Sequence, residues 1–255
     1  MHRLYLQKYK PDNILLQEEG KPAKLQISYH FYSDHFNQNF NYSFAHPRSD
    51  TCKVCDSLDT KLKYVTGEDE KKQIMSEKAV HLTKAEIFYK EISEKVKLAK
   101  AQSNVETIDF DYQQNLPLPV VPLGDVFYMR QLWVFSFCIF EASTGKSYFF
   151  LYDESMSRKG QNEVTSMLHY YFDNILTNDV TNVYLFSDNC SAQNKNNLLI
   201  QFLYILVNTQ IFQFIIHRYP EPGHSFLPCN RSFALVEKEK RKRERVYLPS
   251  DCVIL

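Results

Sequence analysis

The fold of this chain can be approached from one segment, Leu185–Asn197, LFSDNCSAQNKNN. An apolar run ends at Phe186, a polar and amide-rich segment begins with Asp188 close to its start, and a new apolar pattern follows. A short apolar run bounded in this way indicates a buried strand, and the pattern after it indicates a helix. We therefore expect Asp188 at the carboxyl end of a buried strand, where open α/β sheets build their sites.

The patterns around this segment predict a mixed α/β sheet. Three β-rich runs come before it, and one more strand follows it after a helical pattern. We expect strands within residues 105–113, 131–143, 148–155, 182–188 and 211–219, and helices within 160–177, 192–208 and 229–245. The proline-rich segment NLPLPVVPLGD, residues 115–125, predicts a loop.

The order of these elements predicts a topology. Three consecutive strands favour an antiparallel meander, and two later strands that are each reached through a helix favour parallel pairing. The fold class expected for residues 105–255 is therefore α/β, with three antiparallel strands and then two parallel ones, flanked by helices. This is the element order of the ribonuclease H-like fold.

Residues 1–104 predict a helical N-terminal region. Residues 25–40 carry an aromatic stripe at helical spacing, and residues 67–102 carry acids at the start and lysines at the end, which suits the dipole of a long helix. Between them, SFAHPRSDTCKVCDSL predicts a loop that contains Cys52 and Cys55.

Composition narrows the class of protein. Of 255 residues, 30 are Lys or Arg and 30 are Asp or Glu, so the net charge is zero and any basic surface for nucleic acid has to be local. The first residues contain no apolar core of a secretory signal, and no apolar run is long enough to cross a membrane. The six cysteines are scattered, apart from one pair, which fits reduced thiols. We expect an intracellular chain with no membrane partner and leave its oligomeric state open.

Two aspartates are expected at one edge of the sheet. Asp111 lies in the first strand, which neighbours the fourth strand in this topology, and Asp188 lies at the end of the fourth. Two carboxylates on adjacent central strands can share a divalent cation, and hard oxygen ligands suit Mg²⁺ or Mn²⁺. Glu237, in the last helix, is the candidate third acid.

Each of these acids also has a structural interpretation. Asp188 precedes a helix and can cap it, and Asp111 can be a surface acid at the edge of a strand. Glu237 lies in EKEKRKRER, where acids pair with lysine and arginine in solvent. No single acid indicates a metal site. The metal site is favoured only because the expected sheet brings these acids together.

Five segments of the chain resemble a known family. They are DYQQNLPLP, RQLWVFSFCIF, SRKGQNEVTSML, LFSDNCSAQNKN and PGHSFLPCNRSFALVEK, in this order. Together they resemble a transposase-derived domain of unknown function that is common in arthropod proteins. The upstream segments HPRSDTCKVCDSL and AVHLTKAEIFY resemble the part that precedes that domain, so the resemblance covers nearly the whole chain.

The resemblance implies a ribonuclease H-like transposase core with an acidic metal triad of the DDE/D type. Asp111 matches the family's aspartate before LPLP, and Asp188 matches its SDNC aspartate. Asn230 stands where the family is expected to carry an aspartate, and Ser232 where it is expected to carry a second acid. Glu237 follows Asn230 by seven residues on the same helical face and remains as an alternative third acid.

The function implied is metal-dependent cleavage of DNA phosphodiesters and strand transfer, with DNA as partner and the nucleus as compartment. The altered Asn230, the missing DNA-binding head and the early end of the chain predict a decayed or truncated copy. The alternative is a non-catalytic, domesticated module that keeps the fold and binds DNA or protein. A ribonuclease H-like exonuclease is a third interpretation, so whether the chain is an enzyme stays open.

Other polar residues have two interpretations each. His224 in PGHS can orient or protonate a leaving group, or it can be a structural histidine that bonds a loop carbonyl. Asn189, Gln193 and Asn194 can contact phosphates, hold the carboxylates or satisfy free N–H groups at the start of a helix. The basic run at 238–245 can follow a DNA backbone or form a charged helix exterior.

Cys52 and Cys55 have the spacing of half a zinc site, which needs four ligands. His46 and His81 are the nearest candidates, and we assign His81 with the two cysteines while the fourth ligand stays open. Two reduced structural cysteines in a loop are the alternative.

Overall fold

The computed structural model describes residues 2–9, 27–40 and 51–253. The chain divides into two compact units, Met1–Ser49 and Asp50–Leu255. The helices of the N-terminal region that follow residue 50 therefore belong to the same unit as the sheet, whereas the sequence pattern predicts a boundary after residue 104.

The first unit contains α1 (His2–Tyr9) and α3 (Tyr29–Asn39). Ser28 caps α3, because its hydroxyl oxygen accepts a hydrogen bond from the backbone N–H of Phe31. The ring of Tyr32 on α3 packs against the ring of Tyr5 on α1 at a centroid distance of 5.3 Å. The helix expected within residues 25–40 is confirmed between Tyr29 and Asn39.

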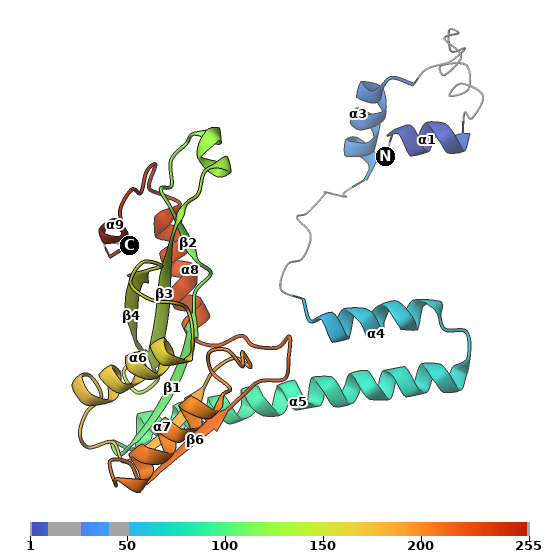
Figure 1. Ribbon diagram of the computed structural model, residues 1–255. Helices are drawn as coiled ribbons and strands as arrows, with labels where there is room; N and C mark the ends of the chain where they lie inside the picture. Colours follow the sequence, from blue (N-terminus) through green and yellow to red (C-terminus); the bar gives the residue numbers. More distant parts are fainter. Residues whose placement is uncertain (1, 10–26, 41–50, 254–255) are drawn as a thin grey trace. The chain divides into compact units, whose positions relative to one another are not determined.

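The second unit begins with two helices, α4 (Lys53–Tyr64) and α5 (Glu68–Ala101), which lie side by side (Figure 1). Acids occupy the first turn of α5 and Lys100 its last turn, so the charges oppose the helix dipole as expected and the long helix is confirmed. The expected loop around Cys52 and Cys55 is wrong: Cys52 directly precedes α4, and Cys55 lies in its first turn. The buried Leu58 and the lysines of the last turn favour a helix here.

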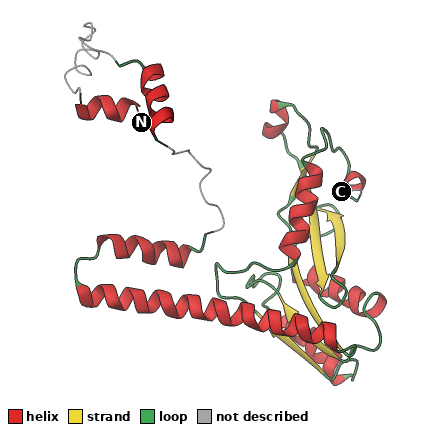
Figure 2. Cartoon of the chain, turned by 180° about the vertical axis from the view of Figure 1, so that it is seen from behind, coloured by secondary structure: helices red, strands yellow, loops and turns green. Residues whose placement is uncertain are grey.

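Six strands form one mixed sheet (Figure 2). They are β1 (Val105–Tyr112), β2 (Leu116–Leu118), β3 (Leu132–Glu141), β4 (Lys146–Asp153), β5 (Asn182–Phe186) and β6 (Phe214–Arg218). β3 pairs antiparallel with β1, β2 and β4, whereas β5 is parallel to β1 and β6 is parallel to β5. The expected sheet, with antiparallel strands followed by two parallel ones, is confirmed.

The short strand β2 was not expected, because its prolines predicted a loop. Leu116 and Leu118 are each 2% exposed and pack in a small cluster with Val134 of β3 and Val246 near the C-terminus. The burial of two leucines therefore favours pairing, although Pro117 between them has no N–H to donate.

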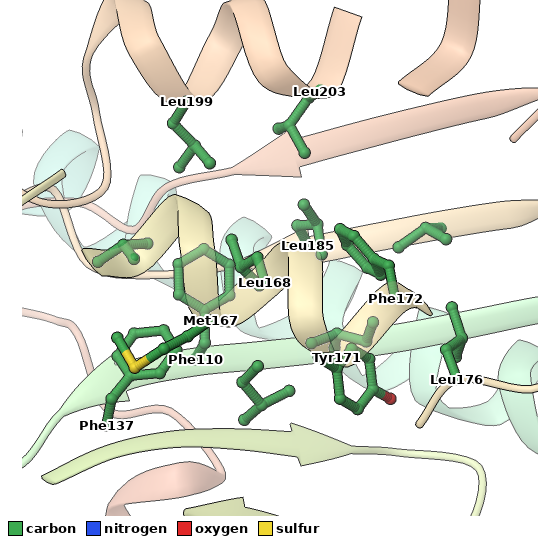
Figure 3. Close-up of a cluster of buried hydrophobic side chains, with 14 of the residues drawn as sticks. Phe110, Phe137, Met167, Leu168, Tyr171, Phe172, Leu176, Leu185, Leu199 and Leu203 are labelled. Carbon is green, nitrogen blue, oxygen red and sulfur yellow. The ribbon is translucent and has the colours of Figure 1, made fainter. Parts of the chain in front are cut away.

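Helices cover both faces of the sheet. α6 (Gln161–Asn174) and α7 (Asn197–Asn208) pack on one face, where Phe110 and Leu185 of the strands meet Leu168 and Leu199 of the helices (Figure 3). α7 begins at Asn197, later than predicted, because the side-chain oxygen of Asn196 accepts a hydrogen bond from the backbone N–H of Leu199 and caps the helix there. The short helices η1 (Gly124–Tyr128) and α9 (Pro249–Cys252) complete the unit.

The opposite face is covered by α5 and by α8 (Cys229–Lys240). Phe88 and Ile92 of α5 and Phe233 of α8 pack with Tyr184 and Phe186 of β5. The long helix is thus part of the core. In the part of the chain that the structure describes, no helix combines the length and the apolar character that crossing a bilayer requires.

Replacing Phe88 by alanine should lower the free energy of unfolding by about 3–5 kcal/mol, the usual cost of truncating a buried phenylalanine. Phe88 is 5% exposed, and its ring lies 5.7 Å from that of Phe186. Ile87, which is 60% exposed, is the matched control, and Ile87→Ala should cost less than about 0.5 kcal/mol. Urea unfolding followed by circular dichroism measures both. Equally small losses would contradict the packing of α5 on the sheet.

Candidate functional site

The register of β1 and β5 brings two aspartates to one edge of the sheet. The parallel pair runs from Val105 opposite Asn182 to Asp109 opposite Phe186. Asp111 and Asp188 each lie two residues beyond this last pair. Burial, followed by the negative charge of Asp188, raises the pKa of Asp111 to about 7. The two side chains, called the carboxylate pair below, are therefore close enough to repel one another.

Each member of the carboxylate pair is held through one oxygen. The Oδ1 atom of Asp111 accepts a hydrogen bond from the backbone N–H of Tyr112 at 2.7 Å. The Oδ1 atom of Asp188 accepts from the backbone N–H of Cys190 at 3.0 Å and from the side-chain amide of Asn194 at 2.6 Å. Within the described residues, neither Oδ2 atom accepts a hydrogen bond. The pair is therefore oriented, with an oxygen of each carboxylate available to a ligand.

The amides near Asp188 hold the site together. Asn194 is fully buried and bonds the carboxylate directly, which is one of the roles expected for it. The side chain of Asn189 donates to the backbone carbonyl of Pro220 in the loop after β6. The carbonyl of Gln193 accepts a hydrogen bond from the side chain of Asn196, the capping residue of α7.

Sequence reasoning missed a third carboxylate, Asp109. It is 3% exposed, and burial raises its pKa to about 7 although the backbone N–H of Cys229 donates to its Oδ1 atom at 2.7 Å. The charge of Asp111 raises the pKa further. The spacing was the available signal, because residues two apart on a strand point to the same face.

Lys159 was also missed, because a lone lysine before a helix carries no distinctive pattern. Its ammonium group donates to the carbonyl of Gln113 and to the side chain of Asn115, each at 2.9 Å. Burial lowers its pKa, and the charges of Asp111 and Asp188 oppose that shift. A partly buried cation therefore stands next to the carboxylate pair.

A cavity of about 520 Å³ opens beside Asp111. Its lining includes Asn230 and Glu237 of α8, so the structure brings both of these predicted residues to Asp111. The Oε1 atom of Glu237 accepts a hydrogen bond from the side-chain amide of Gln113 at 3.1 Å and lies 3.6 Å from the ammonium group of Lys240. We call this space the acid-lined cavity.

The three predicted acids do not converge as a triad. Over residues 2–9, 27–40 and 51–253, the one group of three or more Cys, His, Asp or Glu side chains that could hold a metal ion is a different one. It consists of Cys52, Cys55, His81 and His224, whose ligand atoms all lie within 4.8 Å of one another.

This Cys/His cluster joins three segments that are distant in sequence. The Sγ atom of Cys52 lies 3.1 Å from Nε2 of His81, and that of Cys55 lies 3.5 Å from Nε2 of His224. Burial raises the pKa of Cys52, but hydrogen bonds from the backbone of Cys55 and Val54 and from His81 lower it more, so the pKa is lowered. The thiolate, which is the form that binds metals, is therefore favoured at Cys52, whereas burial and the neighbouring Cys52 raise the pKa of Cys55.

Surrounding residues support the Cys/His cluster. The Nδ1 atom of His81 lies 3.3 Å from a carboxylate oxygen of Glu221. The hydroxyl of Tyr89 donates to the carbonyl of His224 at 2.8 Å. Gly223 has a φ of +84°, and a Cβ there would lie 2.7 Å from Sγ of Cys52, so only glycine fits without a shift.

The outcome for the predicted ligands is mixed. Cys52, Cys55 and His81 lie together as predicted, and the missing fourth member is His224. The structure places His224 in this cluster, where its Nε2 faces Cys55, and not in contact with the carboxylate pair. His46 lies outside the described residues.

The basic run after Glu237 is partly neutralised by its own acids. Lys240 lies 3.6 Å from Glu237, and Lys242 lies 2.7 Å from Glu239. α8 ends at Lys240, so the basic residues from Arg241 onward lie beyond the helix. Contact of this run with DNA stays a prediction.

The fold and the site define a mixed α/β protein that has a half-buried carboxylate pair and a Cys/His cluster that could hold a metal ion. Residues 138–250 match the model of a family described as Domain of unknown function (DUF7869). The matched part is somewhat less than half of the chain and extends from β3 to the start of α9. It includes Asp188, His224, Asn230 and Glu237. Neither a curated protein nor a solved structure matches the chain.

Replacing Asp111 by asparagine should stabilise the metal-free protein more at high pH than at low pH. The pKa of Asp111 is raised from 3.8 to about 7, so its carboxyl keeps its proton in the folded state after the unfolded chain has lost it. The contribution of this group to stability therefore falls as the pH rises through that interval. One pKa unit corresponds to about 1.4 kcal/mol, so the relative gain should be about 1 kcal/mol or more between about pH 5 and about pH 8.

Thermal unfolding across this pH range measures the effect. Asp69→Asn, at a fully exposed acid of α5, is the control and should show no such trend. A melting-temperature difference between Asp111→Asn and the parent that does not change with pH would contradict the raised pKa.

Proposed function

We propose that the chain is a transposon-derived protein with a ribonuclease H-like core that binds Mg²⁺ or Mn²⁺ at the carboxylate pair and cleaves DNA phosphodiesters weakly. The strand order β4-β3-β1-β5-β6 supports the ribonuclease H-like assignment, because it is the order expected for that fold. The observation that carries the proposal is the parallel pairing of β1 and β5, which sets Asp111 and Asp188 side by side.

The donor set of the carboxylate pair fits a hard divalent cation. Each aspartate has one oxygen fixed by hydrogen bonds and one that accepts none from the described residues. Their mutual repulsion in a buried place is relieved when a cation lies between them. A cation held by Asp111 and Asp188 would supply the activation of water for phosphodiester hydrolysis, and a second cation would be needed to stabilise the leaving oxygen. Lys159 offers a further positive charge for a phosphate oxygen.

The proposed activity is weak because the chain lacks a good third ligand for the divalent cations. Asn230 offers one acceptor oxygen but lacks the charge that binds a hard cation. Glu237 lines the same cavity, but it is engaged by Gln113 and Lys240. The proposal therefore expects one strong cation site and a poor second one.

We assign Zn²⁺ to the Cys/His cluster. Two cysteine and two histidine side chains are a common ligand set for structural zinc, which is four-coordinate and closed to solvent ligands. The carboxylate of Glu221 at Nδ1 of His81 matches the usual support of a zinc-bound histidine. On this assignment His224 is a zinc ligand, and its proposed catalytic role is given up.

The second candidate function is a non-catalytic module that binds DNA or protein. The amide at Asn230 and the engagement of Glu237 favour it, since they leave only Asp111 and Asp188 of the three acids that the resemblance implies. On the first candidate, DNA is the substrate, the nucleus is the compartment, and the exposed part of the basic run, which follows Glu237 in the chain, is a candidate surface for DNA phosphates. A nicking assay separates the two.

Nicking of supercoiled DNA with Mn²⁺ should be weak for the parent chain and stronger for Asn230→Asp, because a charged third ligand is restored. Asp188→Asn should reduce nicking to background. Strong cleavage by the parent that is lost in both Asp188→Asn and Glu237→Gln would show that Glu237 is the third ligand and that the enzyme is intact. No cleavage by any form, Asn230→Asp included, would support the non-catalytic module.

Purified protein should contain one zinc per chain, and Gly223→Ala should lower that content. Gly145 is the matched control, because its φ is +72° but nothing lies within 4 Å of a built Cβ. Both alanine variants should lose about 1–2 kcal/mol of stability from the left-handed backbone. Only Gly223→Ala pushes against Cys52. Elemental analysis that finds no zinc in the parent, or equal zinc in both variants, would contradict the assignment.

A further inference from the structure

We infer that metal held by the Cys/His cluster shapes the acid-lined cavity and sets how tightly the carboxylate pair binds a divalent cation. The inference rests on the proposed function and adds to it a regulation of the same site. It is argued from the chain segments that connect the cluster to the two aspartates.

The cluster lies in the wall of the acid-lined cavity. Thr51 directly precedes Cys52, and Gly223 and Ser225 stand on either side of His224. All three of these neighbours line the cavity together with Asp111. A displacement of Cys52 or His224 therefore moves the cavity wall.

The loop between β6 and α8 also supports Asp188. The carbonyl of Pro220 accepts a hydrogen bond from the side chain of Asn189, the residue after Asp188. The hydroxyl of Tyr219 donates to the carbonyl of Asn194 at 3.0 Å, and the side chain of Asn194 donates to Asp188 at 2.6 Å. Two contacts thus connect the start of the loop to the carboxylate.

The end of the same loop holds α8 against β1. The backbone N–H of Cys229 donates to Asp109, two residues before Asp111 on β1. α8 then carries Asn230 and Glu237 into the cavity. The loop that contains Glu221 and His224 is therefore attached at one end to the residues that hold Asp188 and at the other end to Asp109, two residues before Asp111.

This loop has little regular structure of its own, so its position depends on side-chain contacts. One is the backbone bond from His224 to Glu221 at 2.9 Å, and another is the bond from Tyr89 to the carbonyl of His224. Coordination by Cys52 and Cys55 at the start of α4 and by His81 on α5 fixes the loop to two helices at once. Loss of the metal releases that attachment.

The test measures Mn²⁺ binding by electron paramagnetic resonance of the free ion, with zinc content determined on the same samples. The full chain is compared in its zinc-loaded form and after removal of zinc by a chelator that is then dialysed away. Cys55→Ser removes a ligand of the cluster, and Asn189→Ala removes the contact to Pro220 without touching the cluster. His169→Ala, at an exposed histidine of α6, is the control. Asp188→Asn defines Mn²⁺ binding that does not use the carboxylate pair.

The zinc-free chain and Cys55→Ser should bind Mn²⁺ about 10- to 100-fold more weakly than the zinc-loaded parent, the range seen when the outer support of a metal site is lost. His169→Ala should match the parent. If Cys55→Ser fails to fold by circular dichroism, Asn189→Ala decides: it should keep one zinc and still bind Mn²⁺ more weakly.

Equal Mn²⁺ affinity in the parent, the zinc-free chain and Asn189→Ala would overturn the coupling and leave the cation site standing. A zinc-loaded parent that binds no more Mn²⁺ than Asp188→Asn would overturn the cation site and the coupling together. A parent that takes up no zinc would overturn the coupling through the Cys/His cluster.

Discussion

Asp111 and Asp188 repel one another at the end of the β1–β5 pair, in a place where burial already disfavours charge. Much of the second unit holds these two side chains in place. β1 is central, because it pairs antiparallel with β3 on one side and parallel with β5 on the other. Apolar layers cover both faces of these strands. The apolar core therefore offsets the stability that the two repelling acids remove. Proteins commonly compensate in this way for functional groups that destabilise the folded state.

The long helix α5 belongs to this support. Phe88 and Ile92 bury α5 against the sheet, while His81, about two turns earlier on the same helix, joins the Cys/His cluster. One helix thus contacts both an apolar layer of the sheet and, through Tyr89, the loop that carries His224. This explains why the compact unit begins at Asp50 and not at the first strand.

Sequence patterns were sufficient for five of the six strands, all except β2, and for the two aspartates. Alternating and continuous apolar runs identify strands locally, and the element order then places Asp111 beside Asp188. The rest depends on contacts that local patterns do not encode. His224 meets Cys55 across 169 residues of chain, and Leu116 and Leu118 form a strand because distant residues bury them. Asp109 could have been predicted, because the DFD spacing places it on the same face of the strand as Asp111. Its hydrogen bond with Cys229 could not be predicted, because the two residues are distant in the sequence.

The central claim is that Asp111 and Asp188 share a divalent cation. The most direct test is a crystal structure of the zinc-loaded chain soaked in Mn²⁺, with anomalous maps recorded at the manganese and zinc absorption edges. The account predicts a manganese peak between the two aspartates, with Oδ2 of each as ligand, and a separate zinc peak among Cys52, Cys55, His81 and His224. A well-ordered site with no manganese density between the aspartates at saturating Mn²⁺ would contradict it.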